Sequence, residues 1–259
     1  MGPTDSMMVV LTHPEDPARD DEYNFWYSGN HLSDVLLIPG FESASRFKQA
    51  ISVQGTAPQY AALYQVDSKD VVATQEVLMK HFATENEFRE PMPLATNNSL
   101  PASEGLISVD SWGYYEKISD TGTAIPSGDD GPKAIMTVWT HPHDPSKIDE
   151  FNHWYDSNHV IDVIKAPHFR SATRYKQAMQ IRGEMPAPYL CVYELDSADI
   201  DDVHAELMKW LSTPDDFRLP MPQLDEENGL VQIDFWGYYT TVAQGHKAPL
   251  EELLAAQSS

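Results

Sequence analysis

Residues Asn24–His31 read Asn-Phe-Trp-Tyr-Ser-Gly-Asn-His, and residues Asn152–His159 read Asn-His-Trp-Tyr-Asp-Ser-Asn-His. The repetition continues downstream, because the segment Ser43–Ala50 returns, nearly unchanged, as Ser171–Ala178. Two later motifs, Pro-Met-Pro and Trp-Gly-Tyr-Tyr, also occur twice and in the same order. A repeat that keeps its order at a nearly constant offset predicts a tandem duplication of one domain. We expect the residues that both copies keep to form the core or to carry the chemistry.

The composition limits the classes of partner. The chain has 259 residues and a formal net charge of -23, so nucleic acid and anionic membranes are poor partners. Its one cysteine, Cys191, lies in an apolar run and is expected to be a small buried residue, with no disulfide framework or cysteine-based metal site. No apolar run is long enough to span a bilayer, and no signal pattern opens the chain, so we expect a cytoplasmic protein.

Each copy is predicted to follow the order β-α-β-β-α-β, which is the ferredoxin-like arrangement. In the first copy we expect strands at 7–12, 43–53, 60–66 and 106–115, a helix at 20–37, and a second helix that begins after Ser68 as its N-cap. In the second copy we expect strands at 134–140, 171–181, 189–195 and 230–239, a helix at 148–165, and a second helix after Ser197.

The predicted domains are a first ferredoxin-like domain at 7–118, a linker at 119–132, a second ferredoxin-like domain at 133–242 and a C-terminal tail at 243–259. A ferredoxin-like sheet carries helices on one face only, so its other face must be covered. Two fused copies can stack their bare faces and close a barrel within one chain. The expected fold class is therefore α+β, with two tandem βαββαβ domains forming an intramolecular dimeric α+β barrel.

The last strand indicates where the space inside such a barrel would lie. Alternation places Val231, Ile233 and Phe235 on one face. It places on the other face Gln232, Asp234, Trp236 and Tyr238. The first set is predicted to pack under the helices, and the second set to face a wet, aromatic lumen between the two sheets.

The chain resembles the EthD-like group of the dimeric α+β barrel superfamily. In the second half the resemblance is carried by Phe151–His159, Pro167–Phe169, and the run from Ala187 that ends at Asp196-Ser197. The first half matches through Tyr27, His31, Pro39-Gly40-Phe41, Pro58 with Tyr60, and Asp67-Ser68. The resemblance implies small-molecule chemistry inside the barrel, since muconolactone isomerases, polyketide cyclases, cofactor-free monooxygenases and haem peroxidases belong to the superfamily. The Pro-Leu that often follows the helix histidine in EthD-like sequences is replaced here, by Ser33-Asp34 and Ile161-Asp162.

The leading catalytic candidates are His31 and His159. A histidine titrates near neutral pH and can move a proton in either direction. On a helix with 100° per residue, Asp34 and Asp162 lie on the same face as these histidines, where a carboxylate could orient the imidazole and raise its pKa. The alternative is a histidine that stabilises the helix C-terminus through a backbone carbonyl.

Arg46 and Arg174 are further catalytic candidates, because a guanidinium can bind a carboxylate or enolate oxygen through two hydrogen bonds. Asp110 and Asp234 lie on the strand face predicted to line the lumen and could act as a second acid or base. The alternative is a structural ion pair between these arginines and aspartates.

Polar and aromatic residues that recur in both copies are candidates for substrate binding. In the first half they are Trp26, Tyr27, Asn30, Tyr60, Asp110 and Trp112. In the second half they are Trp154, Tyr155, Asn158, Tyr189, Asp234 and Trp236. Tyr64 and Tyr193 recur as well and could donate to an oxyanion. The alternative for each aromatic residue is packing in the core. His13 and His141 end the first strand of each copy, either at the barrel mouth or as turn residues, and no metal-ligand spacing is present.

These residues predict a cofactor-independent isomerase, cyclase or lyase that moves a proton on a small aromatic or lactone-like metabolite. One alternative is a haem-dependent or cofactor-free oxidase or monooxygenase of the same superfamily, with haem as the cofactor to consider next. Another is a small-molecule-binding module without turnover. We expect a small-molecule substrate as the partner, and either a monomer with a pseudo-dimer barrel or a homodimer of it.

Overall fold

The computed structural model describes residues 4–83, 105–125, 131–213 and 229–247. The elements of the first half are β1 (Ser6–Pro14), α1 (Asp20–Trp26), α2 (Leu32–Leu36), β2 (Phe41–Gln54), β3 (Tyr60–Val66), α3 (Val71–Phe82) and β4 (Ile107–Gly122). Those of the second half are β5 (Ala134–Pro142), α4 (Ile148–Trp154), α5 (Val160–Val163), β6 (Phe169–Arg182), β7 (Tyr189–Leu195), α6 (Ile200–Ser212) and β8 (Val231–His246). The predicted βαββαβ order is confirmed in both halves.

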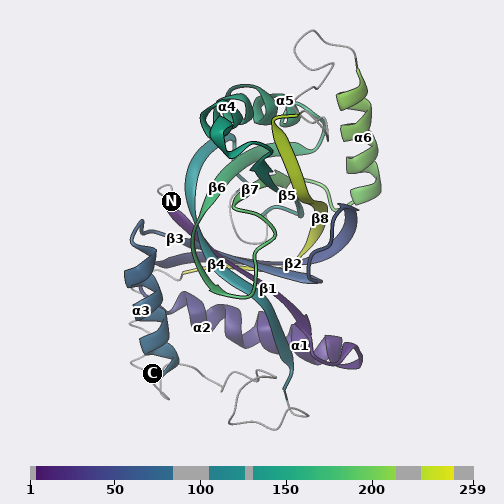
Figure 1. Ribbon diagram of the computed structural model, residues 1–259. Helices are drawn as coiled ribbons and strands as arrows, with labels where there is room; N and C mark the ends of the chain where they lie inside the picture. Colours follow the sequence, from purple (N-terminus) through teal and green to yellow (C-terminus); the bar gives the residue numbers. More distant parts are fainter. Residues whose placement is uncertain (1–3, 84–104, 126–130, 214–228, 248–259) are drawn as a thin grey trace.

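The eight strands form one closed antiparallel barrel in the order β1-β3-β2-β8-β5-β7-β6-β4. The two halves join where β2 pairs with β8 and where β4 pairs with β6. Helices α1, α2 and α3 lie on one side of the barrel, and α4, α5 and α6 lie on the other (Figure 1). The expected α+β class and the intramolecular barrel are therefore confirmed.

The strands that join the two halves are longer than expected. β4 continues to Gly122, into the segment expected as a linker, because its last residues pair with β6 as far as Ser171. β8 likewise continues to His246, which pairs with Ser43 of β2. The tail from residue 248 onward and the two Pro-Met-Pro motifs lie outside the described residues.

The interior of the barrel is an apolar core rather than the wet lumen that we expected. All eight strands contribute side chains to this core. One example from each strand, in chain order, is Met7, Phe47, Leu63, Tyr115, Ile135, Tyr175, Leu190 and Phe235. Two of the core's polar groups are satisfied within the barrel, since Trp139 donates to the Tyr115 hydroxyl and Tyr115 donates to the carbonyl of Ala187. A small cavity of about 80 Å³ lies at one end, beside Gln65, Tyr175 and Glu194.

A β-bulge in β8 explains why the face assignment of the last strand was wrong. Trp139 pairs with Phe235 and the next residue, Thr140, pairs with Ile233, so Asp234 is an extra residue in β8. A bulge of one residue turns the following side chains to the other face. Ile233 packs under the helices as predicted, but Phe235 lies in the barrel core, and Trp236 and Tyr238 lie on the helix side. β4 has the same irregularity at Asp110.

The first helix of each half is interrupted by one π-helical turn, at Tyr27–His31 and at Tyr155–His159. The uniform 100° wheel used above therefore does not hold beyond the start of this turn. The predicted N-caps of the second helices were also wrong. Asp70 and Asp199 cap α3 and α6, because their carboxylates accept hydrogen bonds from backbone N–H groups in the first turn.

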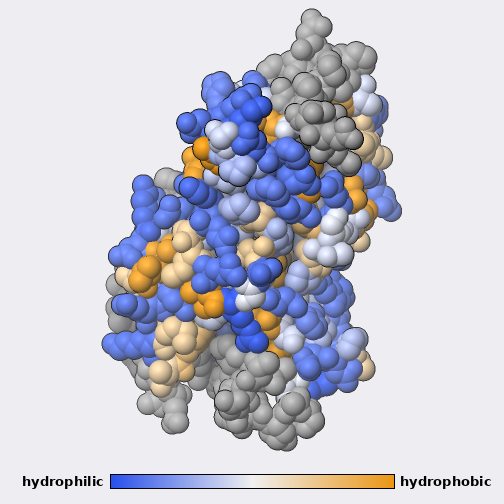
Figure 2. All heavy atoms as spheres, viewed as in Figure 1, coloured by the Kyte–Doolittle hydropathy of each residue, from blue (hydrophilic) through white to orange (hydrophobic). Residues whose placement is uncertain are grey.

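The surface agrees with the acidic composition. On the face shown in Figure 2, hydrophilic residues predominate and hydrophobic residues occur in small, separate groups. Among the described residues, none of the helices has the length and apolar character needed to cross a membrane.

Candidate functional site

A cavity of about 440 Å³ lies between the sheet of the first half and its helices, outside the barrel. Its lining residues are Met8, Val10, Thr12, Trp26, Tyr27, His31, Val35, Tyr64, Phe82, Ile107, Val109, Trp112, Ile181 and Arg182. The last two belong to β6, so the second half completes the wall of a first-half site. The expectation of a shared site between the two sheets was wrong, because the barrel core fills that space.

The π-helical turn positions His31 in the cavity wall. The backbone N–H of Leu32 donates to the carbonyl of Tyr27, five residues earlier, which widens the helix at this point. On an α-helix, residues 26 and 31 would point about 140° apart. Here the Trp26 and His31 rings stack, with centroids 4.9 Å apart and planes 14° apart. π-Helical turns of this kind occur frequently at functional sites.

Burial makes His31 a neutral imidazole. It lowers the pKa of His31 to about 3, and the charge of Arg46 acts in the same direction. In the second half, burial lowers the pKa of His159 to about 4, although the carboxylate of Asp162 raises it. The expected rise in histidine pKa from the neighbouring aspartate is therefore outweighed by burial. A neutral imidazole can accept a proton or bind a metal ion.

Arg46 is fully buried behind the cavity wall. Its guanidinium lies 4.1 Å from the centre of the Tyr27 ring and donates to Ser28 Oγ at 2.6 Å and to Asn24 Oδ1 at 3.2 Å. The guanidinium is thus held by stacking on an aromatic ring and by two hydrogen bonds, and none of these contacts is with a carboxylate.

Arg174 occupies the same place in the second half but has a different partner. It lies 4.2 Å from the centre of the Tyr155 ring and donates to Asn152 Oδ1 at 3.0 Å. Its other contact is an ion pair with Asp156, at 2.7 Å. The two halves thus hold the same guanidinium with and without a carboxylate.

Asp110 and Asp234 do not pair with these arginines, and they do not line the cavity. Each lies at a β-bulge, where its Oδ2 contacts a histidine Nδ1: Asp110 with His13 at 2.8 Å and Asp234 with His141 at 2.6 Å. The proposed arginine–aspartate ion pair is therefore wrong. The two histidines, expected at the barrel mouth or in a turn, instead hold the bulge of the neighbouring strand.

The remaining first-half candidates divide between the cavity and its surroundings. Trp26, Tyr27 and Trp112 line the cavity, as His31 does. Asn30 and Asp34 lie on the same helical segment but not in the lining, and Tyr60 donates to Asp20 Oδ1 at 2.7 Å in the surrounding network.

The second-half candidates recur between the second sheet and its helices. Tyr155 and Tyr189 are core residues there, and Trp154 and Trp236 pack against them. Asn158 lies within the π-helical turn, and Asp162 is buried on α5. The indole N–H of Trp236 donates to Met136 Sδ at 3.1 Å. That of Trp112 is buried without a hydrogen-bond partner among the described residues.

Several lining residues were not predicted from the sequence, including Phe82, Ile107, Val109, Ile181 and Arg182. Arg182 and Ile181 reach the site through the pairing of β4 with β6, whose register the repeat does not reveal. Cys191 is buried as expected, and burial raises the pKa of its thiol to about 12. Within the described ranges, no group of three or more His, Cys, Asp or Glu residues could hold a metal ion.

Solved structures of low sequence identity share this fold. An anthrone oxidase-like protein is 16% identical, with 95% of each chain covered and a TM-score of 0.56. A predicted monooxygenase from Fusobacterium nucleatum is 9% identical, with 95% of this chain and 97% of that chain covered and a TM-score of 0.55. A haem-degrading enzyme from Listeria monocytogenes is 11% identical, with 90% and 98% covered and a TM-score of 0.35. No protein-family model matches the chain, and neither does any curated protein.

The similarity to the anthrone oxidase-like protein and to the predicted monooxygenase shows the barrel fold, whereas membership of the EthD-like group and the duplication itself stay predictions. One expectation is corrected. We expected no cofactor, and this was wrong as an inference from the fold, because a haem-degrading enzyme is among the proteins that resemble this chain.

Proposed function

We propose that this chain is an oxidase or monooxygenase that acts on a small, flat, aromatic molecule in the first-half cavity. The observation that carries the proposal is an apolar, aromatic cavity of about 440 Å³ with one neutral, buried imidazole in its wall. This volume lies within the usual range of small-molecule sites. The anthrone oxidase-like protein and the predicted monooxygenase support it by analogy of fold.

The walls of the cavity suit a planar ligand. Trp26, Tyr27 and Trp112 offer ring faces and edges for stacking, and the aliphatic residues of β1 and β4 add apolar walls from which a bound ligand would displace water. Exclusion of water strengthens every electrostatic interaction inside the site.

His31 is the group placed to take a proton from the substrate. Burial and the charge of Arg46 disfavour the imidazolium. A substrate anion that forms beside the ring reverses this preference, because a nearby opposite charge favours the charged form. The same anion interacts favourably with the buried charge of Arg46.

The lining residues also fit a haem. The unprotonated imidazole of His31 suits iron ligation, the walls are apolar, and Arg182 is a cation that could pair with a propionate. A bound haem would supply redox chemistry toward oxygen or peroxide. We expect added hemin to give a Soret band that His31→Ala abolishes and that the matched variant His159→Ala retains. Equal bands in the two variants would place the haem elsewhere.

The test of the function itself is oxygen uptake with anthrone as the probe, measured with and without hemin. Val10 lines the cavity, and Val138 takes its place in the second half. Val10→Phe fills the site and is expected to abolish uptake, whereas Val138→Phe is expected to retain it. Thermal unfolding confirms that each variant is folded. Uptake that survives in folded Val10→Phe contradicts the proposal.

The isomerase, cyclase or lyase activity stays a second prediction, because a neutral His31 can also move a proton in a reaction without oxygen. Conversion of a substrate under strictly anaerobic conditions, lost in His31→Gln, would favour it over the oxidase.

A further inference from the structure

The charged residues around the first-half cavity differ from those of the chain as a whole, which is strongly acidic. The chain carries 40 Asp and Glu residues against 17 Lys and Arg residues. Among the described residues that line the cavity there is no carboxylate, while Arg182 contributes a guanidinium and a second one, that of Arg46, lies behind Tyr27. Asp34 is buried on the adjoining helix but is not part of the lining.

The carboxylate of Asp20 interacts electrostatically with Arg46, but its direct partners are other residues. The carboxylate of Asp20 forms an ion pair with Lys48 at 3.0 Å and accepts from Tyr60 at 2.7 Å. Arg46 instead donates to the neutral oxygens of Ser28 and Asn24. Among the described residues, Arg46 therefore has only neutral oxygens as hydrogen-bond acceptors. The carboxylate of Asp20 interacts with it electrostatically but without a direct hydrogen bond, so it cancels less of the field of Arg46 than a bonded carboxylate would.

In the second half, a carboxylate pairs directly with the corresponding arginine. There Ile148 stands in the place of Asp20, and Asp156 stands in the place of Ser28 and forms the ion pair with Arg174. The same fold position thus carries an arginine without a directly paired carboxylate in the first half and an arginine–aspartate ion pair in the second.

We propose that the first-half cavity binds aromatic molecules that carry an ionised oxygen group, and that Ser28 determines this specificity by leaving Arg46 without a directly paired carboxylate. Arg182 can donate to the ligand oxygen at the wall. Arg46 acts from behind Tyr27, as a positioning residue that sets the field of the site. The inference uses the cavity of the proposed function but requires no turnover.

The experiment measures binding of 2-naphthoate and its neutral isostere 2-naphthamide by quenching of tryptophan fluorescence, since Trp26 and Trp112 line the cavity. The wild type is expected to bind naphthoate about tenfold more tightly than naphthamide. Ser28→Asp copies the second half and is expected to weaken naphthoate binding about tenfold while naphthamide changes by less than about twofold.

The matched control is Ser157→Asp, which adds the same charge to the exposed face of the second-half helix and is expected to leave both affinities unchanged. Arg182→Gln is expected to reduce the preference for naphthoate independently, so the test does not depend on one variant. Equal affinity for the two probes in the wild type overturns the proposal, as does an equal effect of Ser28→Asp on both probes.

Binding and turnover separate this inference from the proposed function. A preference for naphthoate in a protein without oxygen uptake overturns the function alone. Oxygen uptake in a protein that binds the two probes equally overturns the inference alone.

Discussion

The two halves of the barrel agree in geometry and differ in charge. Both have a π-helical turn, a stacked Trp–His pair and a fully or nearly fully buried arginine over a tyrosine ring. They differ at the arginine's partner, which is Ser28 in one half and Asp156 in the other. The repeated motif therefore encodes the same local geometry in both halves, while a single position sets the charge beside the arginine.

The difference in the arginine's partner is also expected to affect the stability of the folded protein. Asp156 stabilises Arg174 in the folded state, whereas Arg46 is held by a ring face and two neutral acceptors. A charged group that is desolvated without a counter-ion contributes less to stability. The first half therefore retains a charge that a ligand anion can use, at the expense of stability.

The largest expected effect comes from removing each arginine. Arg174→Met leaves the carboxylate of Asp156 without its cation, and we expect a loss of about 3 kcal/mol in the free energy of unfolding. Arg46→Met leaves only neutral acceptors behind, and we expect a loss of about 1 kcal/mol. Urea unfolding of both variants measures the difference. Equal losses would mean that Ser28 and Asp156 are energetically equivalent partners.

A smaller effect is expected from acid. Because burial lowers the pKa of His31 to about 3 and that of His159 to about 4, the unfolded chain binds more protons than the folded chain below pH 6.5. Stability therefore falls as the pH drops below 6.5. Between about pH 7 and pH 5 each histidine is expected to contribute about 2 kcal/mol to this fall, so His31→Gln and His159→Gln should each remove that amount.

The two histidines are expected to behave alike at pH 5, because both are neutral in the folded state there. His153→Gln is the control, since this side chain is exposed on α4. Urea unfolding at the two pH values provides the measurement. A fall of the same size in His31→Gln and in the wild type would show that His31 is accessible to water in the folded protein.

The repeat made the fold predictable from the sequence. Two copies of one βαββαβ pattern predicted eight strands, and the bare sheet faces predicted that the strands close one barrel. Among the candidate site residues, His31, Trp26, Tyr27 and Trp112 do lie in one cavity. They were found because both copies keep them.

The location of the cavity was not predictable, for two physical reasons. A bulge adds one residue, Asp234 or Asp110, to the last strand of each half, and strict alternation then assigns the following aromatics to the wrong face. Arg182 reaches the site through pairing between the halves, which the repeat does not encode. The change from Ser28 to Asp156 was visible in the sequence, but its meaning required the position of Arg46.

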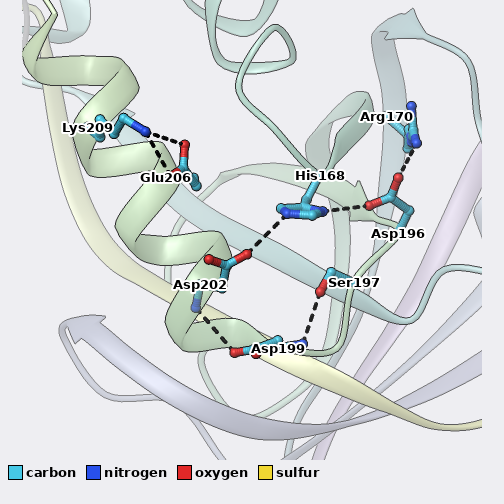
Figure 3. A network of polar contacts seen from close by, with 8 residues as sticks. All are labelled: His168, Arg170, Asp196, Ser197, Asp199, Asp202, Glu206 and Lys209. Carbon is cyan, nitrogen blue, oxygen red and sulfur yellow. Dashed lines mark hydrogen bonds and ion pairs between the residues drawn. The ribbon is translucent and has the colours of Figure 1, made fainter.

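The turn before the second strand of each half shows another divergence. In the first half Gly40 has a φ of 92°, and in the second half His168 has a φ of 73°. Figure 3 shows His168 between two carboxylates, with Nδ1 at 3.0 Å from Asp196 and Nε2 at 3.3 Å from Asp202 of α6. Asp196 also contacts Arg170. A side chain in the left-handed region costs about 1 kcal/mol, and these partly exposed ion pairs can offset it.

The smallest expected effects test that balance. His168→Gly removes both the strain and the ion pairs, and we expect the free energy of unfolding to change by less than about 1 kcal/mol. His168→Ala keeps the strain without the ion pairs and should be about 1 kcal/mol less stable than His168→Gly. Gly40→Ala measures the cost of the left-handed backbone alone, because a Cβ at this position meets no heavy atom within 4 Å. We expect this variant to lose about 1 kcal/mol in the free energy of unfolding. If His168→Gly instead loses more than about 2 kcal/mol, the contacts to Asp196 and Asp202 stabilise the second half beyond the values of exposed ion pairs. The two halves would then differ at this turn in energy as well as in sequence.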